Sequence, residues 1–86
     1  MAKKASAAQA KRLAWLWSDG RSAHILHDGR YTSSTDLACA KRGWLAPTGH
    51  FDTYPNGARY EFYEVTTAGL HALGAYLLAL QAQEAS

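Results

Sequence analysis

The sequence predicts an α+β domain, because its apolar residues follow helical spacing near both ends and strand spacing between them. Leucines recur every three or four residues in the first and last thirds, whereas "RYEFYEV" at 59–65 alternates like a strand. With 86 residues, 48% of them hydrophobic, the chain can bury one small core. We therefore expect a single compact domain over 1–86, with three helices, a small antiparallel sheet, and a flexible basic N-terminus at 1–5.

The first helix is predicted over 6–19. Ser6 and Gln9 have the spacing of a capping box, in which each side chain satisfies a free amide of the first turn. Gly20 is a typical residue at a helix C-terminus. The core-facing stripe is expected to comprise Ala10, Leu13, Ala14, Leu16 and Trp17.

Residues 21–32 lack helical periodicity. Asp28 and Gly29 form a dipeptide that favours a hairpin turn between "AHILH" and "RYT". We expect one short strand here, or two.

A second helix is predicted over about 34–43. Ser33 lies three residues before Asp36, which is again the capping-box interval, and Gly43 ends the helix. Leu37 and Ala40 are expected to face the core.

A hairpin and a third helix follow. Trp44–Leu45 should form a strand that leads into a loop, with its tightest turn at 55–57, and Arg59–Val65 should return as the second strand. Thr66 or Thr67 should cap the last helix, predicted over 67–83. This helix carries leucines at heptad spacing, namely Leu70, Leu73, Leu77 and Leu80.

This order of elements, together with the string T-x-L…K-R-G-W-L…Y-x-F-Y-x-V-T-x-A-G-L between Thr35 and Leu70, resembles the second half of a winged-helix domain. MarR-like and PadR-like regulators, and small proteins of phages and other mobile elements, carry the same features. The resemblance implies a DNA-binding regulatory protein whose 55–57 hairpin is the wing. The chain departs from the family upstream: about a dozen extended residues replace the helix before the recognition helix, so the helix-turn-helix is degenerate.

Double-stranded DNA is therefore one expected partner. Serine and threonine at a helix N-terminus can donate to phosphates, and cations at its other end can contact them. The candidate residues are Arg30, Ser33, Ser34, Thr35, Lys41 and Arg42, with His50, Tyr54, Asn56 and Arg59 on the wing. The same residues also suit helix capping and the helix dipole, and a net charge of +2 permits DNA binding without requiring it.

A protein-binding module that does not use DNA, such as a phage-type inhibitor or adaptor of a host complex, is the alternative. Trp15 and Trp17 are two residues apart, so they cannot face the same core, and Trp15 is an expected interface residue. Tyr76 and Leu78 widen the apolar arc of the last helix, which also suggests a homodimer through that helix.

The sequence gives little support to catalysis, a metal or a cofactor. Cys39 lies in an apolar setting typical of a small core residue, and it could join only His24 and His27 as metal ligands, with no second closely spaced pair. Nucleophile elbows and phosphate-binding glycine loops are absent. We expect a non-enzymatic cytoplasmic protein with no signal peptide and no membrane association.

Overall fold

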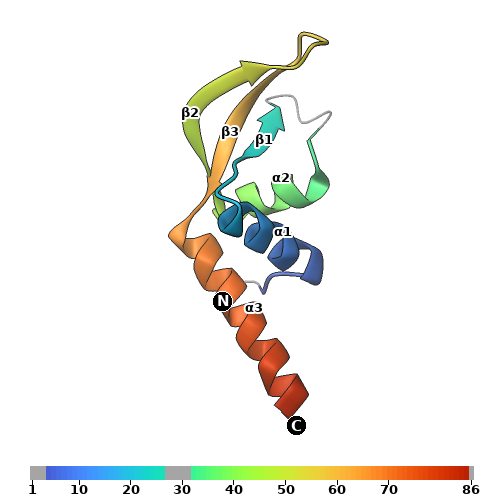
Figure 1. Ribbon diagram of the computed structural model, residues 1–86, viewed down its shortest axis with the longest axis vertical. Coiled ribbons are helices and arrows are strands. Elements are labelled where there is room, and N and C mark those ends of the chain that lie inside the picture. The colour runs from blue at the N-terminus through green and yellow to red at the C-terminus, as the bar shows by residue number, and fades with distance from the viewer. Residues whose placement is uncertain (1–3, 27–31, 86) are drawn as a thin grey trace.

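The computed structural model describes residues 4–26 and 32–85 and shows an α+β domain (Figure 1). Its strands form an antiparallel sheet in the order β1-β3-β2, so β3 lies in the centre. The predicted order of helices and strands is confirmed. The elements are α1 (Ala7–Ser18), β1 (Ala23–Leu26), α2 (Ser34–Lys41), β2 (Leu45–Thr53), β3 (Arg59–Val65) and α3 (Thr67–Ala85).

The core lies between the helices and one face of the sheet. Leu13 and Leu16 of α1 and Cys39 of α2 are almost fully buried. They pack in one cluster with residues from the sheet and from the first half of α3, namely Ala23, Trp44, Leu45 and Leu73. The domain is elongated, measuring 51 × 22 × 21 Å, with the β2–β3 tip at one end and the C-terminal part of α3 at the other (Figure 1).

The first helix begins as predicted. Ser6 is its N-cap, and the capping box with Gln9 is complete: the Gln9 amide donates to Ser6 Oγ at 3.2 Å, and the Ser6 amide donates to Gln9 Oε1 at 2.9 Å. The placement of Trp17 in the core stripe is wrong, because its side chain is 58% exposed. Trp17 lies in the last turn of α1, shortly before Gly20 turns the chain with φ of 62°.

The second helix is shorter than predicted and faces the core with a partly different set of residues. It ends at Lys41, Arg42 is the C-cap, and Gly43 turns the chain with φ of 77°. The expectation that Leu37 and Ala40 face the core holds for Ala40, which packs half-buried against the core cluster, whereas Leu37 is half-buried and outside that cluster. Asp36 and Cys39 are the buried residues of the helix. The predicted Asp28–Gly29 turn lies outside the described residues.

The segment after Leu45, predicted as a loop, is a continuous strand to Thr53. It contains a bulge between Pro47 and Phe51, where Gly49 has φ of 83°. The Gly49 amide donates to the buried Glu61 carboxylate at 3.2 Å, which fixes the bulge. Pro47 is tolerated because β2 is an edge strand, on which a missing amide leaves no neighbour unpaired.

The start of α3 is anchored to the loop after α2. Thr66 is its cap, as predicted: Thr66 Oγ1 accepts from the Gly69 amide at 3.0 Å. The Thr66 amide donates to the Trp44 carbonyl at 2.9 Å, and Thr66 Oγ1 donates to the Gly43 carbonyl at 2.6 Å. The first turns of α3 pack on the core through Leu73, and both Trp44 and Leu73 are buried.

Candidate nucleic-acid interface

The end of α2 lies beside the backbone that leads into α1. Arg42 Nη1 donates to the Lys4 carbonyl at 3.1 Å and to Gln9 Oε1 at 3.1 Å. The Arg42 guanidinium also lies 5.0 Å from the ring centroid of Trp44. Lys41, the last residue of α2, is exposed next to it. We call Lys4, Lys41 and Arg42 the basic corner.

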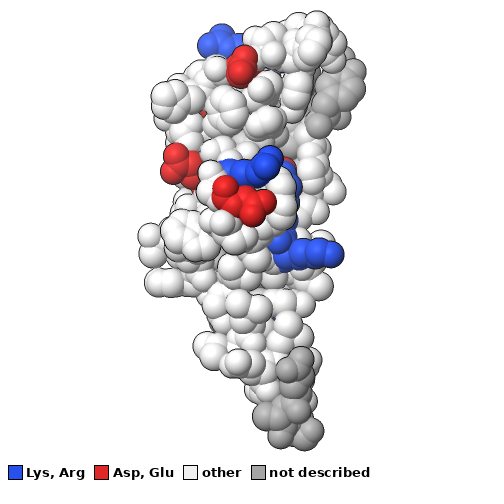
Figure 2. All heavy atoms as spheres, in the orientation of Figure 1, with Lys and Arg blue, Asp and Glu red and all other residues white. Residues whose placement is uncertain are grey.

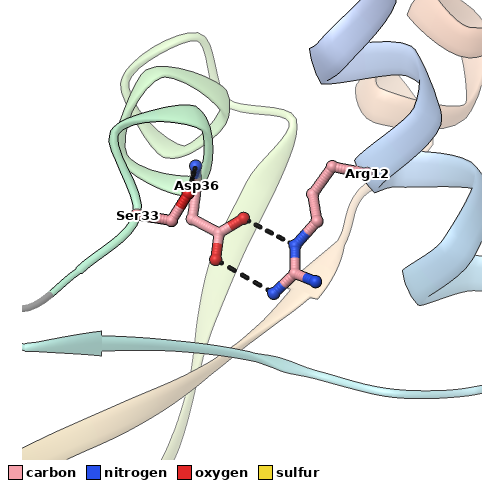
Figure 3. Close-up of polar contacts among 3 residues, drawn as sticks. All are labelled: Arg12, Ser33 and Asp36. Atoms are coloured by element: carbon pink, nitrogen blue, oxygen red, sulfur yellow. Dashed lines mark hydrogen bonds and ion pairs between the residues drawn. The ribbon is translucent and has the colours of Figure 1, made fainter.

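The acid of α2 is neutralised on the inner side of the helix. Arg12 of α1 donates from Nε to Asp36 Oδ1 at 2.8 Å and from Nη2 to Oδ2 at 3.1 Å (Figure 3). The Asp36 side chain is 4% exposed and that of Arg12 is 34% exposed. The Ser33 hydroxyl accepts from the Asp36 amide, so Ser33 caps α2 as predicted while the carboxylate serves the ion pair. Sequence reasoning missed this pair, because two residues 24 positions apart give no local signal.

The charges around the basic corner favour an anionic partner. Within the described part of the chain, the two ion pairs are Arg12–Asp36 and the longer Arg21–Asp19, and neither uses a residue of the basic corner. Figure 2 shows cationic atoms at mid-height on one face, with acidic atoms close to part of them. The face that Figure 2 shows is therefore not a broad basic surface.

The predicted wing residues do not join the basic corner. In Figure 1 the β2–β3 tip lies far from the end of α2 where the chain enters β2. Tyr54 is half-buried, its hydroxyl is 3.2 Å from His24 Nδ1, and Asn56 Oδ1 accepts from the Ala58 amide inside the turn. Arg59 and His50 are exposed, and the Arg59 guanidinium lies 4.5 Å from the Phe51 ring centroid. Of the predicted wing, Arg59 and His50 are therefore best placed for an external ligand.

At the N-terminus of α2, Ser33 and Ser34 are exposed and Thr35 is half-buried. They lie at the opposite end of the helix from Lys41, about 12 Å away at the rise of an α-helix. Arg30 lies outside the described residues. The sequence-predicted site thus divides into the α2 N-terminus, the wing and the basic corner.

The predicted protein-interface residues are also separate from one another. Trp15 is 43% exposed, and the guanidinium groups of Arg12 and Arg21 lie over its ring at 4.9 and 5.2 Å. Tyr76 packs half-buried at the edge of the core, whereas Leu78 is 68% exposed. Trp15 and Leu78 are therefore accessible to a partner, whereas Tyr76 packs against the core of the monomer.

Cys39 and His24, which were considered as metal ligands, pack among other side chains of the domain. Cys39 is a buried core residue, as predicted, and burial, with a smaller effect of the Asp36 carboxylate, raises the pKa of its thiol. His24 stacks on Tyr60 with ring centroids 4.3 Å apart. The described residues contain no cluster of three or more potential metal ligands. None of the described helices combines the length and hydropathy needed to span a bilayer.

Comparison with known proteins gave no family: the chain matches no protein-family model, no curated protein and no solved structure.

Proposed function

We propose that the protein is a winged-helix-like, non-enzymatic regulatory module that binds double-stranded DNA through its basic corner. The observation that carries the proposal is the hydrogen bond from Arg42 to the Lys4 carbonyl, which brings the backbone of Lys4 to the end of α2 that carries Lys41 and Arg42. The neutralisation of Asp36 by Arg12 removes the nearest acid on the same helix. Clustered cations that lack acidic partners are what phosphate contacts require.

The architecture supports the winged-helix element of the proposal. α2 directly precedes the β2–β3 hairpin, as a recognition helix precedes its wing, and the antiparallel sheet has the order β1-β3-β2. Only residues 27–33 separate β1 from α2, too few for another helix of ordinary length. α2 is braced by α1 through Arg12–Asp36 instead. This degenerate arrangement favours phosphate contacts over base reading, so we expect binding of low sequence specificity.

The test is fluorescence anisotropy on a random duplex, titrated with salt. Lys41→Gln and Lys4→Gln should each weaken binding, and each should lower the slope of log affinity against log salt by about 0.9. Arg42 is left intact because it has structural hydrogen bonds. The matched control is Lys11→Gln: Lys11 is exposed and lies about 200° around α1 from Gln9, facing away from the corner.

Two results would reject the proposal. One is no salt-dependent binding by the wild-type protein at low ionic strength. The other is a slope that Lys11→Gln lowers as much as Lys41→Gln does, because the contacts would then be diffuse.

A protein-binding function is the second candidate, and one observation favours it. Trp17 is 58% exposed and borders an open hollow of about 430 Å³ that Leu16 and Val65 also line. Arg21 and Glu64 line the hollow as well, and an exposed tryptophan beside a hollow with both apolar and charged lining is typical of an interface anchor. If this function holds, Trp17→Ala should abolish binding of an identified partner, and Trp15→Ala should weaken it less because two guanidinium groups already cover that ring.

A further inference from the structure

The outer half of α3 projects away from the rest of the domain (Figure 1). Its leucines are accessible: Leu77 is 52% exposed, Leu78 68% and Leu80 37%. Residues 67–83 contain no Lys, Arg, Asp or Glu, and the lower part of the molecule is accordingly white in Figure 2 apart from its grey tip. The projection is therefore an apolar helix whose one charged residue, Glu84, lies next to its last residue.

A short helix of this kind is not stable alone. Isolated helices of fewer than about 12–15 residues are marginal in water, and most helical stability in proteins comes from packing of an apolar face. The outer half of α3 has no oppositely charged residues at i,i+4 spacing that could stabilise it from within. The packed first turns of α3 nucleate the helix, and a surface that covers the leucines would stabilise its outer half further.

The leucines define which side of the helix needs that cover. Leu70, Leu73, Leu77 and Leu80 follow heptad spacing along one side. Leu73 packs in the core and is 9% exposed, and Leu77 and Leu80 continue the same stripe beyond it. Leu78 lies about 100° around the helix from Leu77 and about 160° from Leu80, so it belongs to another side.

We propose that a second copy of this chain covers Leu77 and Leu80, with the two α3 helices antiparallel and Leu77 of one copy beside Leu80 of the other. A heptad stripe is self-complementary in a two-fold pair, and α3 has no charges there to repel its copy. A helix that binds a membrane surface carries Lys and Arg on its polar face, and α3 has neither. Two short helices bury less than the roughly 800 Å² per partner of a standard interface, so the dimer is weak and depends on concentration. This inference does not depend on DNA binding.

The experiment is sedimentation equilibrium over a wide range of protein concentration. The wild-type protein should shift from monomer to dimer, and Leu77→Glu/Leu80→Glu should remain monomeric. Leu78→Glu is the control matched to the single variant Leu77→Glu: each adds one negative charge to the same helix, and Leu78→Glu should dimerise like the wild type. Circular dichroism of each variant verifies that the core of the domain is intact, since all three leucines are exposed in the monomer.

The antiparallel register has its own test. Leu77→Glu and Leu80→Lys should each dimerise poorly alone, and a mixture of the two should recover dimer, because the new carboxylate then faces the new ammonium. A monomeric wild type at the highest soluble concentration overturns the proposal. If Leu78→Glu loses the dimer as completely as Leu77→Glu/Leu80→Glu does, the assigned face of α3 is wrong. If the mixture does not recover dimer, the antiparallel register is wrong.

Discussion

The Arg12–Asp36 pair should show an asymmetric response to mutation, because its two partners differ in access to water. Replacing Arg12 with methionine keeps the aliphatic bulk but leaves the Asp36 carboxylate, which is 4% exposed, without its cation. Replacing Asp36 with asparagine leaves a guanidinium that is 34% exposed and still lies over the Trp15 ring. Arg12→Met leaves a buried charge without its partner, and Asp36→Asn does not.

The expected costs follow from that difference. Breaking a buried ion pair by removing one partner costs about 3–5 kcal/mol, and partial exposure of Arg12 places Arg12→Met near the lower end of that range. Asp36→Asn should cost about 1–2 kcal/mol, the loss of charge-assisted hydrogen bonds by a residue that can reach water. Arg12→Met/Asp36→Leu replaces both charges by apolar groups and should fall within about 1 kcal/mol of the wild type.

Urea unfolding followed by tryptophan fluorescence measures the free energies of unfolding of the wild type, Arg12→Met, Asp36→Leu and Arg12→Met/Asp36→Leu, which form a double-mutant cycle, and also that of Asp36→Asn. A double variant more stable than Arg12→Met would confirm that the stranded carboxylate dominates. Additive costs, or Asp36→Asn more damaging than Arg12→Met, would refute the reasoning, since the two side chains would then not act as a pair.

The remaining predictions concern α3 and the core thiol. Gly69→Ala should destabilise the domain by about 1–3 kcal/mol in urea unfolding, because the added Cβ would lie 2.5 Å from the Trp44 carbonyl oxygen. The control Gly74→Ala meets no atom within 4 Å and should stabilise by up to about 1 kcal/mol, so equal effects would contradict the close approach. The raised pKa of the Cys39 thiol, ordinarily 9.0, means that the unfolded thiol ionises first. The preference of the folded state for the protonated Cys39 thiol stabilises the protein below the pKa of the unfolded thiol. This stabilisation is lost as the pH rises through the pKa of the folded thiol. The wild type should therefore lose more stability than Cys39→Ala between about pH 8 and pH 10.

Much of the fold could be predicted because its signals are local. The Ser6 capping box, Gly43 and Thr66 each mark a helix boundary within a few residues of sequence, and the structure places a boundary at each. The bulge in β2 could not be predicted in the same way. It depends on Glu61, a carboxylate from the neighbouring strand that the sequence gives no reason to place beside the Gly49 amide.

The candidate site was less predictable than the fold for a related reason. Lys41 and Arg42 could be selected as cations at a helix end, but Lys4 joins them only through a carbonyl contact 38 residues away in sequence. The burial of Asp36 was missed because an acid is almost never fully buried unless it is paired, and the partner lies on another helix. Trp17 was misplaced because periodicity gives the side of a helix and not how far the neighbouring elements extend along it.

Trp44 connects the two proposed binding surfaces. Its ring lies 5.0 Å from the Arg42 guanidinium of the basic corner, and its carbonyl accepts from the Thr66 amide at the start of α3. With Gly69 packed on the same carbonyl, the corner and α3 are held by one short, buried segment with little freedom to move independently. A dimer formed through α3 would therefore hold two basic corners at a fixed separation. Its duplex affinity should exceed that of a monomer by the effective concentration of the second corner. The variant Leu77→Glu, which should dimerise poorly, should then bind duplex more weakly than Leu78→Glu, although both add one carboxylate to α3 and both carry intact basic corners.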